Sequence, residues 1–135
     1  MKNYRVILLS AVLALTANFG YAQNTNSEPT IYVGNKILGG KIDKDTILAY
    51  PFFNATSNDG TEWNVVSYRL TIVRQIGGNS VEDKPIAVSG AEFTEQIKSL
   101  IQTAPSGTNL EFSEIRVQGV LGTRTIATPL MVRIK

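Results

Sequence analysis

A long alternation of apolar and polar residues runs from Trp63 to Gln75 and constrains the fold more than any other stretch. One side of an extended chain would be apolar throughout, with Val66, Tyr68, Leu70 and Ile72. The other side begins with Trp63 and Val65 and then turns polar, which is the period of a half-buried strand. Because most strands have about 5–6 residues, we expect a bend or bulge midway.

Shorter strand patterns, bounded by turn residues, surround this one. We expect strands at 31–33, 46–50, 84–88, 110–117 (with a bulge near Ser113 and Glu114) and 124–134, turns at 34–35, 77–80 and 120–123, and a loop at 54–60. One amphipathic helix is expected from about Phe93 to Gln102, with Ser89 and Glu92 as a capping box before it. These patterns predict a mainly β fold, a compact antiparallel β-sandwich-like domain with one short crossover α-helix.

The apolar faces of these elements define the predicted core. Its members are Val66, Tyr68, Leu70, Ile72, Phe93, Ile97, Leu100, Leu110, Phe112, Ile115, Val117, Leu130, Val132 and Ile134. Truncating Leu70 or Leu100 to alanine is expected to cost about 2–5 kcal/mol.

The first 22 residues have the layout of a secretory signal peptide. Lys2 and Arg5 precede an apolar run at 6–17, and Gly20 and Ala22 are the small residues before a cleavage site. The run is too short to cross a bilayer core of about 30 Å as a helix. We therefore expect export with cleavage after Ala22, and the lack of a cysteine near this site excludes a lipid-anchored lipoprotein.

The sequence then divides into a signal peptide at 1–22, a polar flexible leader at 23–30 and one β domain at 31–135. No cysteine is present, so the exported domain folds without disulfides, which favours a bacterial periplasm or outer cell surface. The mature chain is expected to contain no transmembrane segment.

Composition excludes several kinds of chemistry. The chain has no histidine and no cysteine, so Ser-His-Asp and Cys-His catalysis are excluded. The net charge of +2 comes from Lys2 and Arg5 alone, and the mature chain is neutral, which argues against nucleic acid as a partner. We expect no enzymatic activity, no cofactor and no metal.

Three motifs suggest chemistry but have simpler explanations. The segment 34–42 has the glycines and lysine of a phosphate loop, but it lacks the Ser or Thr after the lysine and a following helix. The acids at 43–45 and Asp59 lack the ligand pattern of a calcium loop. Glu111 and Glu114 could form an acid–base pair only if a bulge brought them to one face, and solvated carboxylates are the simpler interpretation.

Partner contact is expected at an unprotected strand edge or an exposed aromatic pair. Pro85 and Pro129 protect two candidate edges, whereas the strand at 31–33 has no such residue. Trp63 and Tyr68 are expected in the core, but Phe52 and Phe53 stand beside Pro51 and a polar loop. The predicted contact residues are Ile31, Tyr32, Val33, Phe52 and Phe53.

Four segments together resemble the C-terminal domain of the gliding-motility protein GldM, also called PorM, of type IX secretion systems. They are Ile31–Ile42, Trp63–Val73, Ser89–Leu100 and Glu111–Lys135, and they span nearly the whole mature chain. The turn at 120–123 departs from the polar turn with Pro, Asp and Gly that is usual in the family.

The resemblance implies a stand-alone, non-enzymatic binding module that associates with itself or with another cell-envelope protein. Members of the family span the periplasm as dimers and couple an inner-membrane motor to outer-membrane components, and they offer no catalytic residues. Two alternatives stay open: a small-molecule or glycan-binding periplasmic protein, which needs a pocket of about 300–1,000 Å³, and a carboxylate-based glycan hydrolase.

Overall fold

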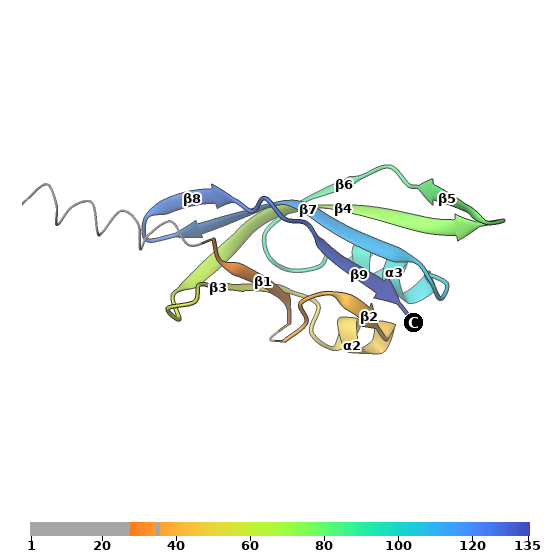
Figure 1. Cartoon of the computed structure of the whole chain (residues 1–135), viewed down its shortest axis with the longest axis horizontal. Coiled ribbons are helices and arrows are strands. Elements are labelled where there is room, and N and C mark those ends of the chain that lie inside the picture. Colours follow the sequence, from red (N-terminus) through yellow and green to blue (C-terminus); the bar gives the residue numbers. More distant parts are fainter. Residues whose placement is uncertain (1–27, 35) are drawn as a thin grey trace, which may run out of the picture.

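The computed structural model describes residues 28–34 and 36–135, which form nine strands and two short helices (Figure 1). The strands are β1 (Thr30–Val33), β2 (Gly40–Ile42), β3 (Phe53–Thr56), β4 (Glu62–Ile76), β5 (Asn79–Glu82), β6 (Ile86–Ser89), β7 (Asn109–Gly119), β8 (Gly122–Thr125) and β9 (Leu130–Ile134). The helices are α2 (Lys44–Ala49) and α3 (Glu95–Thr103). The prediction of a mainly β fold is confirmed, and the predicted signal peptide lies outside the described residues.

The strands form one curled sheet in the order β1-β3-β4-β7-β9-β2. β5 and β6 also pair with β4, and β8 pairs with β7. The pairs are antiparallel except that β2 runs parallel to β9. The curl brings the segment before β1 against the link between β8 and β9, where the Glu28 carboxylate accepts a hydrogen bond of 2.7 Å from the backbone N–H of Ala127.

β4 contains the expected bulge. Val65 and Ser67 pair with successive residues of β7, so Val66 is an extra residue on β4. The bulge shifts the alternation by one position, so Trp63 and Val65 are buried together with Tyr68. The prediction that Trp63 and Val65 face away from Tyr68 was wrong, and Val66 is only half-buried.

β7 contains a second bulge near Ser113 and Glu114, as predicted. Glu114 has a φ of 48°, the one positive value outside glycine in the described residues. Phe112 and Ile115 are three residues apart, yet both are buried. The two bulges thus keep the apolar residues of the central strand pair on one side of the sheet.

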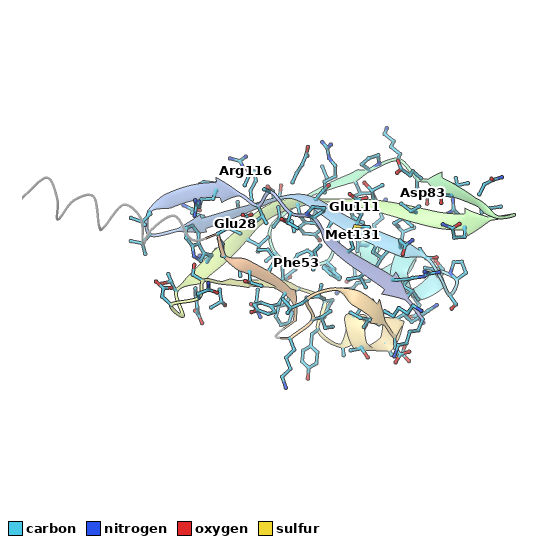
Figure 2. All side chains as sticks on the ribbon, viewed as in Figure 1. Glu28, Phe53, Asp83, Glu111, Arg116 and Met131 are labelled. Carbon is cyan, nitrogen blue, oxygen red and sulfur yellow. The ribbon has the colours of Figure 1, made fainter. Side chains whose placement is uncertain are left out.

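Four aromatic rings fill the interior: Phe53, Tyr68, Phe93 and Phe112. The ring centroid of Phe53 lies 4.8 Å from Tyr68 and 4.9 Å from Phe112, both edge to face. Such pairs contribute about 0.5–1.5 kcal/mol beyond area burial, and Figure 2 shows Phe53 in the interior. The predicted core is buried with two half-buried exceptions, Val66 and Leu100.

The predicted helix is present as α3, but it begins later than expected. The hydroxyl of Thr94 accepts a hydrogen bond of 3.3 Å from the N–H of Ile97 and caps the helix. The prediction that Ser89 caps it was wrong, because Ser89 ends β6 and Phe93 enters the core before the helix starts.

Residues 46–50, predicted as a strand, instead belong mostly to α2. The carbonyl of Asp43 accepts hydrogen bonds from the N–H groups of Thr46 and Ile47 at 3.0 and 3.2 Å, which closes the first turn. Of this short helix only Ile47 is fully buried. A surface helix of this length needs only about one apolar residue per turn facing the core. A pattern of five residues is therefore too short to distinguish such a helix from a strand.

Lys44 joins the two helices. Its Nζ donates to the backbone oxygens of Gln102 and Ala104 at 3.1 and 2.7 Å. α3 has no basic residue in its last turn, so Lys44 supplies the cation that favours the C-terminal end of a helix. In the described part of the chain, no helix has the length and apolar character needed to cross a membrane.

Two other predicted segments were wrong in part. Residues 54–56, predicted as loop, belong to β3, because Ala55 pairs with Ile31 of β1 and is buried while its polar neighbours face outward. The predicted strand at 124–134 is interrupted at 126–129, where the pairing of β7 passes from β8 to β9.

The β4–β5 hairpin is tighter than predicted. Its turn is limited to Gly77 and Gly78, which have φ values of 60° and 83°, and Asn79 already belongs to β5. The next strand starts at Ile86 rather than at residue 84, since Pro85 has no N–H to donate.

Candidate interaction site

Of the five residues predicted to contact a partner, three lie in β1, one directly before β3 and one at its start, and three of the five face the core. Ile31, Val33 and Phe53 have exposed fractions of 6%, 0% and 3%. Tyr32 and Phe52 are half-buried. Side-chain contact in this region therefore rests on Tyr32 and Phe52, and any further contact uses the backbone of β1.

β1 is the terminal strand of the sheet and has an open side. The N–H of Gly34 donates to the carbonyl of Phe52 on the β3 side at 2.7 Å. On the other side, Val33 exchanges hydrogen bonds of 2.8 and 3.2 Å with Ile37. Since backbone groups alternate sides along a strand, the N–H and carbonyl of Ile31 point the same way as those of Val33. The open edge therefore presents one backbone pair, at Ile31.

A groove of about 290 Å³ follows this open side. Its lining residues are Glu28, Pro29, Thr30, Ile31, Leu38, Ile126, Thr128, Pro129 and Leu130. Most of these side chains are apolar, and Leu38 is 59% exposed. An unpaired strand edge beside apolar side chains is the arrangement that accepts an extended peptide.

The side of the groove opposite β1 is formed by residues 126–130. It was not predicted, because residues 124–134 were expected to form one continuous strand. Pro129 is the available signal, since a residue without an N–H cannot continue an interior strand. The exposed apolar Leu38, directly before Gly39, is a second signal.

The exposed aromatic pair also differs from the predicted one. Phe53 belongs to the core, whereas Tyr50 is 54% exposed and its ring meets that of Phe52 edge to face at 6.5 Å. Tyr50 lies over Gly34, where an added Cβ would be 2.7 Å from the Cβ of Tyr50. The aromatic surface beside β1 is thus formed by Tyr50 and Phe52.

The two candidate acids do not share a pocket. Glu114 forms an ion pair of 3.2 Å with Arg69, and both side chains are about half exposed. The hollow that Glu114 lines also contains Arg69 and Arg116 but not Glu111. Figure 2 shows Glu111 and Arg116 at separate positions along the sheet. This geometry offers no support for a paired-carboxylate hydrolase.

The other motifs have structural roles. Gly39 has a φ of 119° and packs against the carbonyl of Met131, and Gly40 begins β2, so this segment forms a strand rather than a phosphate loop. Asp59 accepts a hydrogen bond of 3.0 Å from the backbone N–H of Thr61, which lowers the pKa of the Asp59 carboxyl. Among the described residues, no group of three or more His, Cys, Asp or Glu side chains could hold a metal ion.

Comparison with known proteins agrees with this architecture. The family model of the GldM C-terminal domain matches residues 28–135, which includes every strand and helix described above. A search of curated proteins finds no match. The family match covers far more than half of the chain, and the protein belongs to the GldM C-terminal domain family.

Proposed function

We propose that this chain is an exported, non-catalytic module of the cell envelope that binds an extended segment of a partner protein at the open edge of β1. Family membership supports a structural role, and the observation that carries the proposed mode of binding is the groove beside Ile31. Backbone groups of the edge supply hydrogen bonds, and the apolar walls supply contact area for alternate side chains of the partner strand.

The groove allows a variant that blocks the site without disturbing the core. Leu38 and Thr128 both line it and both are exposed. The double variant Leu38→Glu/Thr128→Glu places two carboxylates where apolar side chains would enter, and burying unpaired charges opposes binding strongly. Met131→Glu is the matched control, because Met131 is exposed on β9 and does not line the groove.

The test is capture of partners by the tagged full chain, expressed in its own cells and purified from the envelope fraction. We expect an envelope protein, or an untagged second copy of the chain, to be recovered with the wild type and with Met131→Glu, and to be lost with the double variant. Equal recovery with the double variant would place binding elsewhere. A monomer that recovers no protein in any form would refute the proposed function.

Export is tested separately by the mass of the protein recovered from the periplasm or medium. Cleavage after Ala22 leaves a chain that begins at Gln23. A recovered mass that includes residues 1–22 would contradict cleavage, and protein confined to the cytoplasm would contradict export.

A further inference from the structure

The outer face of β1, β3 and β4 carries two rows of polar side chains. The register places Thr30 beside Thr56, and Thr56 beside Glu62. One step along, Tyr32 pairs with Asn54, and the same register puts Asn54 next to Asn64. Since neighbouring strands are about 4.8 Å apart, each row offers polar groups at a regular spacing of about 5 Å across three strands.

A hollow of about 530 Å³ lies on this face, larger than the groove beside β1. It is lined by Tyr32, Asn54, Ala55, Thr56, Glu62, Trp63 and Asn64. The indole ring of Trp63 is turned inward against Gly119, and its N–H donates to the hydroxyl of Ser57 at 2.7 Å. Tyr32 is therefore the aromatic side chain that this hollow presents to a ligand.

Three polar side chains of the hollow are available to a ligand, and a fourth, Asn54, is held in place. Asn54 donates to the carbonyl of Gly34 at 2.7 Å, which holds its amide in place on the sheet. Within residues 28–34 and 36–135, the side chains of Tyr32, Glu62 and Asn64 form no hydrogen bond or ion pair. An amide, a carboxylate and a phenol together supply both donors and acceptors.

We propose that this hollow binds a neutral oligosaccharide. Sugar hydroxyls both donate and accept, so they match the mixed donors and acceptors of the amide and carboxylate side chains. The apolar face of a pyranose ring suits contact with the ring of Tyr32. No lysine or arginine lines the hollow, and Glu62 adds a negative charge, so phosphorylated and other anionic ligands are disfavoured. This site goes beyond the proposed protein-binding function and uses a different surface from the groove.

The proposal is tested by titrating the isotope-labelled mature chain with uncharged hexasaccharides (cellohexaose, laminarihexaose, maltohexaose and chitohexaose) and following backbone amide resonances by NMR. We expect at least one of them to shift the amides of 54–56 and 62–64 in a saturable manner. An oligogalacturonate of the same length is expected to cause much smaller shifts, because its carboxylates meet Glu62.

Two variants and one control locate the site. Tyr32→Ala and Asn64→Ala are each expected to weaken binding by about five- to tenfold, the effect of losing one ring contact or one hydrogen bond. Gln118→Ala is the control, since Gln118 is the exposed cross-strand partner of Asn64 on β7 but lies outside the hollow. Absence of binding by all four sugars, or binding that survives both variants, would overturn the proposal.

The outcomes separate this proposal from the protein-binding function. Leu38→Glu/Thr128→Glu should retain sugar binding, and Asn64→Ala should retain capture of the protein partner. If Asn64→Ala instead abolishes protein capture and no sugar binds, the hollow is part of the protein interface and the sugar proposal is wrong.

Discussion

The middle of the β4–β7 ribbon and the β7–β8 turn beyond it both carry apolar residues, but in opposite environments. In the middle, Phe112 is fully buried among the rings of Phe53, Tyr68 and Phe93. Beyond the end of the ribbon, β7 turns into β8 (Figure 1). In this turn Val120 is 96% exposed and Leu121 is 69% exposed. The difference shows that apolar character predicts burial for a strand residue that faces the core, such as Phe112, but not for residues of a turn, such as Val120 and Leu121.

The largest effect is expected in the middle of the ribbon. Phe112→Ala removes a ring that contacts three others and leaves a cavity, so we expect the free energy of unfolding to fall by about 3–5 kcal/mol. Urea unfolding of the purified domain measures this loss. Met131→Ala, on the exposed side of β9, is the control and should change stability by less than about 0.5 kcal/mol. A similar small change for Phe112→Ala would mean that the middle is not the stabilising region.

The junction between the two regions depends on Gly119. A Cβ at this position would lie 2.7 Å from Cε3 of Trp63, so Gly119→Ala forces the indole to move. We expect a loss of about 1–3 kcal/mol, measured by urea unfolding followed by circular dichroism, a signal that does not depend on the single tryptophan.

A second substitution shows whether the Gly119 effect is steric. Trp63→Leu in the Gly119→Ala background should be less costly than the two separate losses added together, since the clash needs the indole. Strict additivity would show that the glycine matters for another reason.

A smaller, pH-dependent effect is expected in the middle from Tyr68. Its hydroxyl donates to the carbonyl of Glu92 at 2.9 Å, and burial raises the pKa of Tyr68 above the usual value of 10.0. The protonated form is favoured in the folded state, so this contribution is complete below pH 10 and is lost as the pH rises above it.

Tyr68→Phe measures this contribution. We expect it to cost about 1 kcal/mol near neutral pH, and to make unfolding less sensitive to pH above 10, where the wild type weakens. Thermal unfolding of both forms across the alkaline range provides the comparison. Parallel pH curves for the two proteins would contradict a role for Tyr68.

The smallest effect is expected at the hairpin end. Val120→Ser and Leu121→Ser should each change stability by less than about 0.5 kcal/mol, because both side chains are exposed. A loss of stability above about 1 kcal/mol, measured at low protein concentration, would show that other residues of the same chain cover Val120 or Leu121 in solution. A loss that appears only at high concentration would indicate that a second copy covers it.

Much of the fold was predictable because its patterns are local. The alternation in β4, the two bulges and the amphipathic turns of α3 follow from which residues must face the same side. The errors occurred where the local pattern was short or polar. The α2 segment offered five residues that fit either period, and β3 has the polar composition of a loop on its outer face.

The candidate site was predictable only in part. The absence of a protective proline marked β1 as an edge, but the pattern could not reveal that the backbone of Val33 already pairs with Ile37. The partner surface was also assigned to Phe53, although the structure shows that Tyr50 accompanies Phe52 at the surface. Each of these facts depends on contacts between segments, which no single segment encodes.

The sequence by itself determined the strand-rich class, the position of the β7 bulge and the apolar residues available for a core, because these depend on side-chain periodicity and turn chemistry. Only the tertiary structure decided how far the sheet curls, which places Glu28 beside Ala127 and opens a groove between β1 and residues 126–130. It also decided that three strands align Tyr32, Asn54 and Asn64 on one face. The reason is physical: register and curl follow from how all the strands pack together, and a cavity exists only where distant segments meet.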